Sequence, residues 1–255
     1  MGPILQVEKL TKRFGGLTAV SELDFEVREG EILGMIGPNG AGKSTTFNLV
    51  AGTYPATSGQ VRFAGEPILG LPPHRIAARG VMRTFQHNKP FAGMPVLDNV
   101  MVGAHTRFAS SLWSVVLGTS LKEEAERRNK ARELVQFVGL GELANADVTT
   151  LSFGQGRLLE IARALAGEPR LILFDEPAAG LTPAESARLA EIIRGIAARG
   201  IAVLLIEHDM HFLLPLAQRV VVLNFGAKIA DGLPDEIRAH PAVMDAYLGD
   251  HAAAR

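Results

Sequence analysis

A glycine-rich run that ends in lysine and serine is the pattern with the most distinctive chemistry in this sequence. Glycines let successive backbone N–H groups turn towards phosphate oxygens, the lysine can reach the β- and γ-phosphates, and the serine hydroxyl can ligate Mg²⁺. The alternative is a glycine-rich turn that matches by chance, but the run follows an apolar segment and opens a helical one, as phosphate binding requires. The residues of this Walker A match are Gly37, Pro38, Asn39, Gly40, Ala41, Gly42, Lys43 and Ser44, followed by Thr45.

Two adjacent carboxylates follow a second apolar run. Residues 171–174 are Leu-Ile-Leu-Phe, and Asp175 and Glu176 come next. Ligands of open α/β sheets bind at the carboxyl ends of the strands. We therefore expect Asp175 to hold the metal, directly or through water, and Glu176 to orient and activate the attacking water. Alone, the pair would be interpreted as two solvated acids at a strand end, but beside the Walker A match it predicts a nucleoside triphosphatase.

A parallel sheet is needed to bring these residues together. Alternating apolar and polar side chains predict strands at 5–7 and 23–27. Apolar runs predict buried parallel strands at 31–36, 171–174 and 201–206, with helices after residue 43 and over 185–199. The fold class is therefore α/β with a parallel-sheet core. Residues 121–140 are first charged and then apolar, which is typical of surface helices, so we expect a helical lobe inserted over about 88–166.

Composition narrows the class of protein further. The 255 residues include 26 Lys and Arg against 27 Asp and Glu, 47% hydrophobic residues and no cysteine. A net charge of −1 gives no field that could hold a polyanion, so we expect no nucleic-acid partner. The lack of cysteine excludes disulfides, thiol catalysis and cysteine-ligated zinc. The apolar runs are too short to span a bilayer and no signal peptide is evident, which predicts a soluble or peripheral cytoplasmic protein.

The segment Leu-Ser-Phe-Gly-Gln at 151–155 resembles the signature of ABC transporter nucleotide-binding subunits. The resemblance covers almost the whole chain and implies an ABC-type P-loop NTPase with an antiparallel β subdomain, a parallel-sheet core and an inserted helical lobe. It also implies that Ser152, Gly154 and Gln155 contact the γ-phosphate of the nucleotide bound by the opposite subunit. Judged from the residues alone, Ser152 could equally be the N-cap of an amphipathic helix.

Further positions match this family one by one. Phe14 corresponds to the aromatic residue that stacks on adenine, although a loop phenylalanine could equally fill the core. Gln86 corresponds to the glutamine that touches Mg²⁺ and water, and His208 to the switch histidine that contacts the γ-phosphate. The resemblance thus implies that Glu176, His208 and Gln86 are catalytic. It implies that the metal ligands are Ser44, Gln86 and Asp175.

The resemblance also implies one ABC ATPase domain over residues 1–255. Its α/β core would comprise 1–87 and 166–235, its helical subdomain with the signature 88–165, and its C-terminal extension 236–255. Two positions depart from the usual pattern. Phe153 stands where glycine is commonest, and we expect its side chain to point away from the phosphate. Thr182 stands where an acid is usual, which bears on how strongly the two sites of a dimer communicate.

Several short segments are similar to the longer ATPase subunit of bacterial branched-chain amino acid uptake systems, namely 14–16, 85–87, 176–180, 206–210 and 246–249. This implies ATP and Mg²⁺ as cofactors. It implies as partners a second ATPase subunit, two integral-membrane permeases and, indirectly, a periplasmic binding protein. The subunit would then be peripheral, at the cytoplasmic face of the inner (plasma) membrane. A homodimer, import of urea or amides, lipid export and a stand-alone soluble ATPase stay open.

The apolar segment 107–117 contains the only tryptophan, Trp113. It lies in the lobe that docks permeases in this family, so it could be an exposed docking patch. The alternative is that Trp113 and Leu117 pack inside the lobe.

Overall fold

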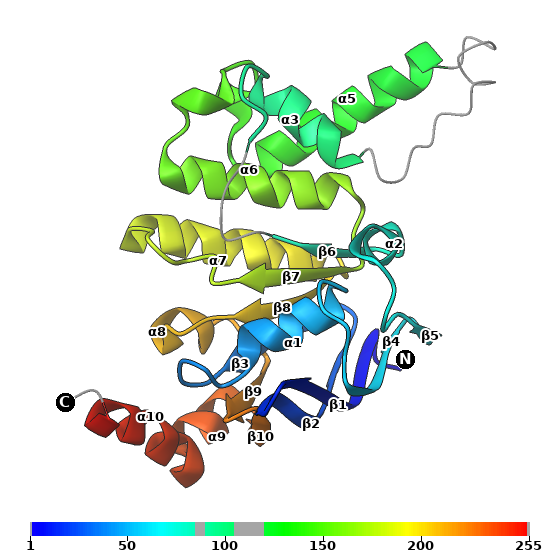
Figure 1. The fold of residues 1–255 in the computed structure, drawn as a ribbon. Coiled ribbons are helices and arrows are strands. Elements are labelled where there is room, and N and C mark those ends of the chain that lie inside the picture. Colours follow the sequence, from blue (N-terminus) through cyan, green and yellow to red (C-terminus); the bar gives the residue numbers. More distant parts are fainter. Residues whose placement is uncertain (1, 85–89, 105–119, 254–255) are drawn as a thin grey trace.

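The computed structural model describes residues 2–84, 90–104 and 120–253. Gln86, Trp113 and the whole segment 107–117 lie outside the described residues. The upper part of the molecule is helical, and the lower part contains the sheets together with further helices packed around them (Figure 1). None of the described helices combines the length and apolar character that a bilayer span needs.

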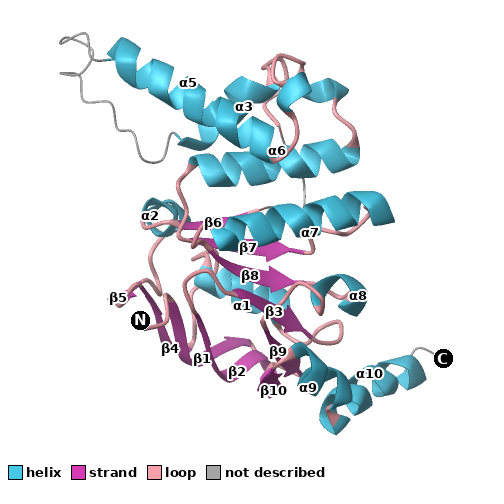
Figure 2. Cartoon of the chain, turned by 180° about the vertical axis from the view of Figure 1, so that it is seen from behind, coloured by secondary structure: helices cyan, strands magenta, loops and turns pink. Residues whose placement is uncertain are grey.

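Two sheets make up the lower part of the molecule (Figures 1 and 2). The antiparallel sheet has the order β2-β1-β4-β5 and consists of β1 (Leu5–Phe14), β2 (Leu17–Val27), β4 (Ser58–Phe63) and β5 (Glu66–Pro67). The six-stranded sheet has the order β10-β9-β3-β8-β7-β6. Its members are β3 (Ile32–Ile36), β6 (Val81–Arg83), β7 (Leu171–Asp175), β8 (Ala202–Ile206), β9 (Arg219–Asn224) and β10 (Ala227–Gly232).

The strands from β9 to β6 run parallel, and β10 is antiparallel to β9. Met35 of β3 pairs with Ile206 of β8, and Ile206 pairs with Asp175 of β7. The carboxyl ends of these three strands are therefore level with one another. The expected strands at 5–7, 23–27 and 171–174 are confirmed, and the other two begin at Ile32 and Ala202, one residue later than expected.

Alternating side chains of the parallel strands enter two separate cores. On β7, Ile172 and Phe174 belong to the core beneath α7, whereas Leu171 and Leu173 belong to the core beneath α1. Every residue of β3, β7 and β8 is buried. Burial on both faces explains why these strands, apart from Asp175 at the end of β7, are apolar instead of alternating with polar residues.

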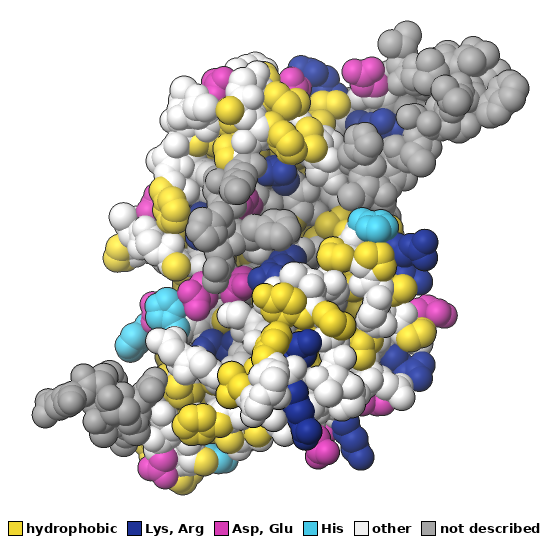
Figure 3. All heavy atoms as spheres, viewed as in Figure 1, with side chains coloured by type: hydrophobic (Ala, Val, Ile, Leu, Met, Phe, Trp, Pro, Cys, Tyr) yellow, Lys and Arg dark blue, Asp and Glu magenta, His cyan; other side chains and the backbone are white. Residues whose placement is uncertain are grey.

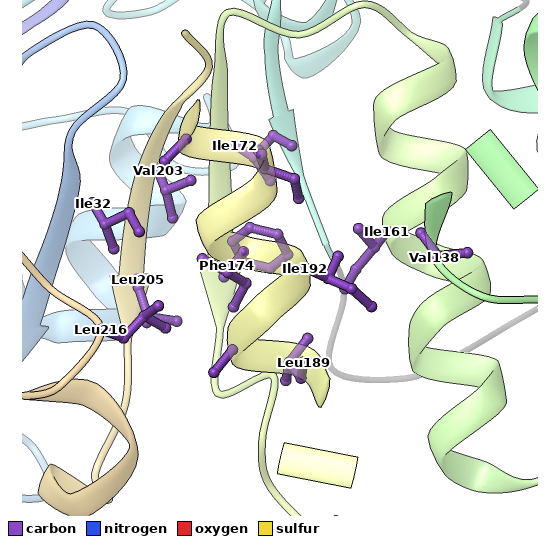
Figure 4. Close-up of a cluster of buried hydrophobic side chains, with 14 of the residues drawn as sticks. Ile32, Val138, Ile161, Ile172, Phe174, Leu189, Ile192, Val203, Leu205 and Leu216 are labelled. Atoms are coloured by element: carbon purple, nitrogen blue, oxygen red, sulfur yellow. The ribbon is translucent and has the colours of Figure 1, made fainter. Parts of the chain in front are cut away.

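Helices cover both faces of the parallel sheet. Besides α1 (Lys43–Val50) and α7 (Pro183–Ala198), these are α2 (Pro73–Ala78), α8 (Met210–Leu213), α9 (Pro234–Ala239) and α10 (Pro241–Ala253). The upper layer contains α3 (Val96–Gly103), α5 (Ser120–Phe137) and α6 (Phe153–Ala166), with short 3-10 turns at Gly141–Leu143 and Val148–Thr150. In Figure 4, Ile192 of α7 faces Ile161 of α6, so α7 joins the sheet to the upper layer.

Candidate active site

Neighbouring parallel strands deliver the candidate residues to one edge of the sheet. The Walker A loop follows β3, Glu207 and His208 follow β8, Asp175 ends β7, and Arg83 ends β6. Because these strands are adjacent and parallel, their carboxyl ends share one edge, which is where α/β sheets bind ligands. In Figure 3, acidic side chains lie beside basic ones where the sheet layer meets the helical layer.

The N-terminus of α1 is open to an anion. Gly42 caps it in a left-handed conformation with φ 101°, without a side-chain cap, and the first turn has no acidic residue. The first N–H groups of a helix lack partners within the helix and carry positive potential. A phosphate group can satisfy both features at this position. Ser44, on the first turn of α1, is exposed, as a metal or phosphate ligand must be.

Glycine is required at two positions of the loop for steric reasons. A Cβ atom on Gly37 would lie 2.1 Å from the carbonyl oxygen of Leu223, and one on Gly42 would lie 2.4 Å from that of Ala19. Both glycines have positive φ. The backbone therefore passes close to β2 and β9 in a shape that residues with a side chain do not permit.

Gly42→Ala should lower the free energy of unfolding by about 2 kcal/mol or more, since overpacking a tight site costs about 1–3 kcal/mol and left-handed strain adds to it. Gly40→Ala is the matched control because Gly40 has φ 78° but no atom within 4 Å of its Cβ position. Urea unfolding followed by circular dichroism measures both. Equal losses in the two variants would contradict the close contact as the cause.

Lys43 turns back onto its own loop. Its side chain is buried, and Nζ donates to the carbonyl oxygens of Gly37 at 2.7 Å and Pro38 at 2.9 Å. The ammonium group is thereby held inside the loop whose N–H groups would surround a phosphate. The structure thus places the Lys43 ammonium within the Walker A loop, and its contact with a phosphate stays a prediction.

Asp175 is buried at the end of β7 with one carboxylate oxygen that makes no hydrogen bond to the described residues. It is 2% exposed, its Oδ2 accepts from Arg83 at 2.8 Å, and its buried Oδ1 has no hydrogen-bond partner among the described residues. An unpartnered buried carboxylate oxygen fits a bound cation. The described residues contain no cluster of three or more His, Cys, Asp or Glu that could hold a metal by itself. A cation here would share Asp175 and Ser44 with nucleotide oxygens.

Glu176 and His208 lie next to each other beyond the strand ends. Glu176 has a left-handed backbone with φ 48°, and its N–H donates to the carbonyl of Ile206 at 3.0 Å. The Nδ1 atom of His208 lies 3.9 Å from Oε2 of Glu176. Both side chains are partly exposed, at 31% for Glu176 and 60% for His208, so both can reach a ligand. The structure therefore brings together the two described residues that we predicted to be catalytic.

Glu207, which lies between strand β8 and His208, is a site residue that was not predicted from the sequence. Its side chain is 1% exposed, Oε1 accepts from the N–H of Ala178 at 2.9 Å, and Oε2 lies 3.8 Å from Nδ1 of His208. Glu207 thus fixes the start of the loop that follows Glu176. A carboxylate directly after five buried apolar residues was the available signal.

The buried carboxyl of Glu207 should make the free energy of unfolding depend on pH. Burial raises the pKa of its carboxyl above the ordinary value, and the N–H of Ala178 opposes this only in part. With a raised pKa in the folded state, its stabilising contribution is complete below the unfolded pKa and is lost as the pH rises through the folded pKa. We expect the urea midpoint of the wild type to fall relative to that of Glu207→Gln as the pH rises above the ordinary pKa of a glutamate.

A carboxyl with the opposite shift provides the control for this titration. The pKa of Glu185 is lowered by the N–H and hydroxyl of Thr182. Its contribution should therefore be present above its unfolded pKa and be lost as the pH falls, so the Glu185→Gln comparison should have the opposite slope. Parallel curves for the wild type and Glu207→Gln would rule out the raised pKa of Glu207.

The signature residues form a helix cap. The N–H of Gln155 donates to Oγ of Ser152 at 3.2 Å, and Oε1 of Gln155 accepts from the N–H of Ser152 at 2.9 Å, so the two residues make a capping box at the start of α6. Ser152 is thus the N-cap of α6, as the alternative interpretation predicted. Gly154 is buried, and a Cβ there would lie 2.2 Å from Oε1 of Glu185. The structure therefore places these residues at the start of α6, where α6 meets α7.

The two departures from the family pattern have local explanations. Phe153 is 57% exposed, and its ring lies against Gly180 and 5.1 Å from the guanidinium of Arg157. Thr182 caps α7 in a capping box with Glu185. Phe153 therefore covers the loop that precedes α7, and Thr182 starts α7 itself.

Phe14 is not a core residue. Its side chain is 45% exposed, the ring meets Tyr54 edge to face at 5.9 Å, and the ammonium of Lys12 lies 4.7 Å from the ring centre. The ring therefore has free surface on which a base can stack, and stacking itself stays a prediction.

Comparison with known proteins decides the family. The family described as ABC transporter matches residues 20–179, which is more than half of the chain. The chain belongs to the ABC transporter family of ATP-binding proteins. A second match, over residues 227–253, is to the family described as branched-chain amino acid ATP-binding cassette transporter.

Relatives and solved structures match the cassette over nearly its full length. The BraF protein of Pseudomonas aeruginosa, a high-affinity branched-chain amino acid transport ATP-binding protein, is 43% identical over 97% of this chain and 98% of its own. LivG of Escherichia coli is 40% identical with the same coverage. The crystal structure of an ABC transporter cassette in its ADP conformation is 32% identical, with a TM-score of 0.86 over 98% of this chain and 100% of its own.

These findings confirm the predicted family and fold class. The cassette is an ABC ATPase, a class that binds and hydrolyses ATP as the ATP-binding subunit of a transporter. Transport implies permease partners in the membrane, and ABC cassettes act as dimers.

Proposed function

We propose that this subunit supplies the energy for import of branched-chain amino acids through a membrane permease. The observation that carries the proposal is the match of residues 227–253 to the cassettes of branched-chain amino acid transporters, beyond the region shared by ABC transporters in general. BraF and LivG, whose names state branched-chain amino acid transport, each match 97% of this chain. No residue of the site touches the cargo in this proposal.

The geometry supports a role in hydrolysis for the site residues that the structure describes, whereas the role of Gln86 rests on the resemblance to the family. The backbone of residues 37–45 and Lys43 bind the phosphates, and Phe14 stacks on the adenine. Ser44, Asp175 and Gln86 would hold Mg²⁺, which neutralises phosphate charge when bound. Asp175 contributes the unpartnered oxygen described above.

In the proposed reaction, Glu176 accepts a proton from water as the water oxygen bonds to the γ-phosphorus. The bond between that phosphorus and the β–γ bridging oxygen breaks, which releases ADP and phosphate. His208, next to Glu176, contacts the γ-phosphate, and Gln86 contacts the water. Ser152, Gly154 and Gln155 close on the γ-phosphate held by the partner subunit, which a helix N-terminus suits.

The proposal extends to assembly and location. The subunit pairs with a second, different ATPase, or with its own copy, beneath two permeases that a periplasmic binding protein supplies. It lies at the cytoplasmic face of the inner membrane. We also propose that residues 1–87 and 166–235 form the core, 88–165 the helical subdomain and 236–255 the C-terminal extension.

Co-purification tests the assembly. Tagged Glu176→Gln subunit is isolated with ATP from detergent-solubilised membranes of the source cell, and the proteins bound to it are identified. We expect two permeases and a second ATPase, with Lys43→Met as a control that recovers less of the second ATPase. Recovery of soluble proteins only, or a nucleotide-dependent dimer without permeases, would contradict the proposal in favour of a stand-alone ATPase.

Uptake tests the cargo. Cells that lack the subunit are supplied with the wild type or with Glu176→Gln, and uptake of radiolabelled leucine, isoleucine, valine and urea is measured. We expect only the wild type to restore uptake of the three amino acids. Restored urea uptake without leucine uptake would assign the subunit to amide import instead.

A further inference from the structure

Arg83 connects two elements that carry proposed magnesium ligands. It is the last residue of β6, on the edge of the sheet next to β7. Its guanidinium donates to Oδ2 of Asp175 at 2.8 Å and to Oδ1 of Asn48 at 2.6 Å. Asp175 ends β7, and Asn48 lies on α1, whose first turn carries Ser44. One planar group therefore connects strand β7 to the helix that follows the Walker A loop.

Burial makes this connection rigid. The side chain of Arg83 is 17% exposed and that of Asp175 is 1% exposed. A buried carboxylate needs a partner, and a guanidinium offers several donors at fixed angles. With Oδ2 of Asp175 held by Arg83, the other oxygen, Oδ1, has no hydrogen-bond partner among the described residues. The ion pair therefore fixes the carboxylate in an orientation that leaves one oxygen available.

We propose that Arg83 is a positioning residue for magnesium: by holding Asp175 and Asn48 at once, it sets the separation of the two elements that carry Asp175 and Ser44. The inference rests on the proposed role of these two residues as metal ligands. A different role would be charge neutralisation alone, in which Arg83 only compensates the buried charge of Asp175. That role predicts unchanged or stronger magnesium binding when the arginine is removed.

The test separates the magnesium-dependent part of nucleotide binding from the rest. The affinity of the full chain for a fluorescent ATP analogue is measured in EDTA and at saturating MgCl₂, and the ratio of the two affinities is the magnesium gain. We expect Arg83→Gln to lower this gain about tenfold, as loss of charge-assisted hydrogen bonds predicts, with the affinity in EDTA within about twofold of wild type. Arg83→Lys should behave like Arg83→Gln, because lysine keeps the charge but lacks the fork.

Arg170→Gln is the matched control. Arg170 donates to Oε1 of Glu29 at 2.7 Å just before the opposite end of β7, so the variant removes an ion pair of similar length next to the same strand but away from Asp175. It should leave the magnesium gain unchanged. Asn48→Ala keeps the pair with Asp175 and removes only the α1 contact, and we expect it to lower the gain about threefold. This variant decides the question if Arg83→Gln does not fold.

Three results would overturn the inference. The first is an undiminished magnesium gain in Arg83→Gln or, where that variant does not fold, in Asn48→Ala. The second is a wild-type magnesium gain in Arg83→Lys. The third is an equal loss of affinity in EDTA and in MgCl₂, which would indicate a purely structural role. A wild type that shows no magnesium gain at all would instead overturn the proposed metal ligands themselves. The two failures are therefore distinguishable.

Discussion

Glu176→Gln is expected to reduce the rate of ATP hydrolysis by a factor of about 10² to 10⁴, the usual contribution of a general base, while ATP binding persists. Gln keeps the shape of the side chain, whose backbone is fixed by the hydrogen bond from its N–H to Ile206. It cannot accept the proton of the attacking water. Phosphate release measures the rate, and size-exclusion chromatography with ATP should show an accumulated dimer.

A matched substitution on α7 tests whether the loss of hydrolysis depends on the position of Glu176 or follows from the loss of any carboxylate. Glu191 is an exposed glutamate on α7, so Glu191→Gln makes the same chemical change away from the sheet edge. It should hydrolyse ATP at the wild-type rate. Normal turnover by Glu176→Gln would show that another group activates the water.

Lys43→Met is expected to weaken ATP binding by a factor of about 10 to 100, which corresponds to the loss of hydrogen bonds from a charged group. Methionine fills much the same volume in the buried site. It removes the charge, however, and also leaves the carbonyls of Gly37 and Pro38 without the ammonium that now holds them. Isothermal titration calorimetry with ATP measures the loss.

Lys130→Ala is the control for Lys43→Met, because it also removes one lysine charge. Lys130 forms an exposed ion pair with Glu168 in the helical layer, far from the Walker A loop in sequence. This variant should bind ATP like the wild type. Thermal unfolding without nucleotide checks that Lys43→Met remains folded, and wild-type affinity in that folded variant would refute the role of Lys43.

Local sequence patterns sufficed for the parts of the site that are continuous in the chain. The Walker A run begins directly after β3, and Asp175 and Glu176 come at the end of β7, and both strands are buried and mainly apolar. By contrast, β6 has only three residues, too few to show a period. Its place at the sheet edge could therefore not be predicted.

The missed residues act through contacts that no local pattern contains. Arg83 and Asp175 are 92 positions apart, and Glu207 and Ala178 are 29 apart. Their importance follows from strand order, which brings β6 beside β7 and β7 beside β8. For Ser152, the residues allowed both a helix cap and a phosphate clamp. The structure shows the cap, and the clamp requires the partner subunit.

The strand order also makes the nucleotide site a late product of protein synthesis. β3 and β7 each pair with β8 and not with each other, and β8 begins only at Ala202. A nascent chain that has emerged as far as residue 200 contains the phosphate loop and both carboxylates but lacks the strand that aligns them. Pairings between distant segments form slowly. Nucleotide can therefore stabilise the folded state only after the segment that contains β8 has emerged, and incomplete chains receive no such protection.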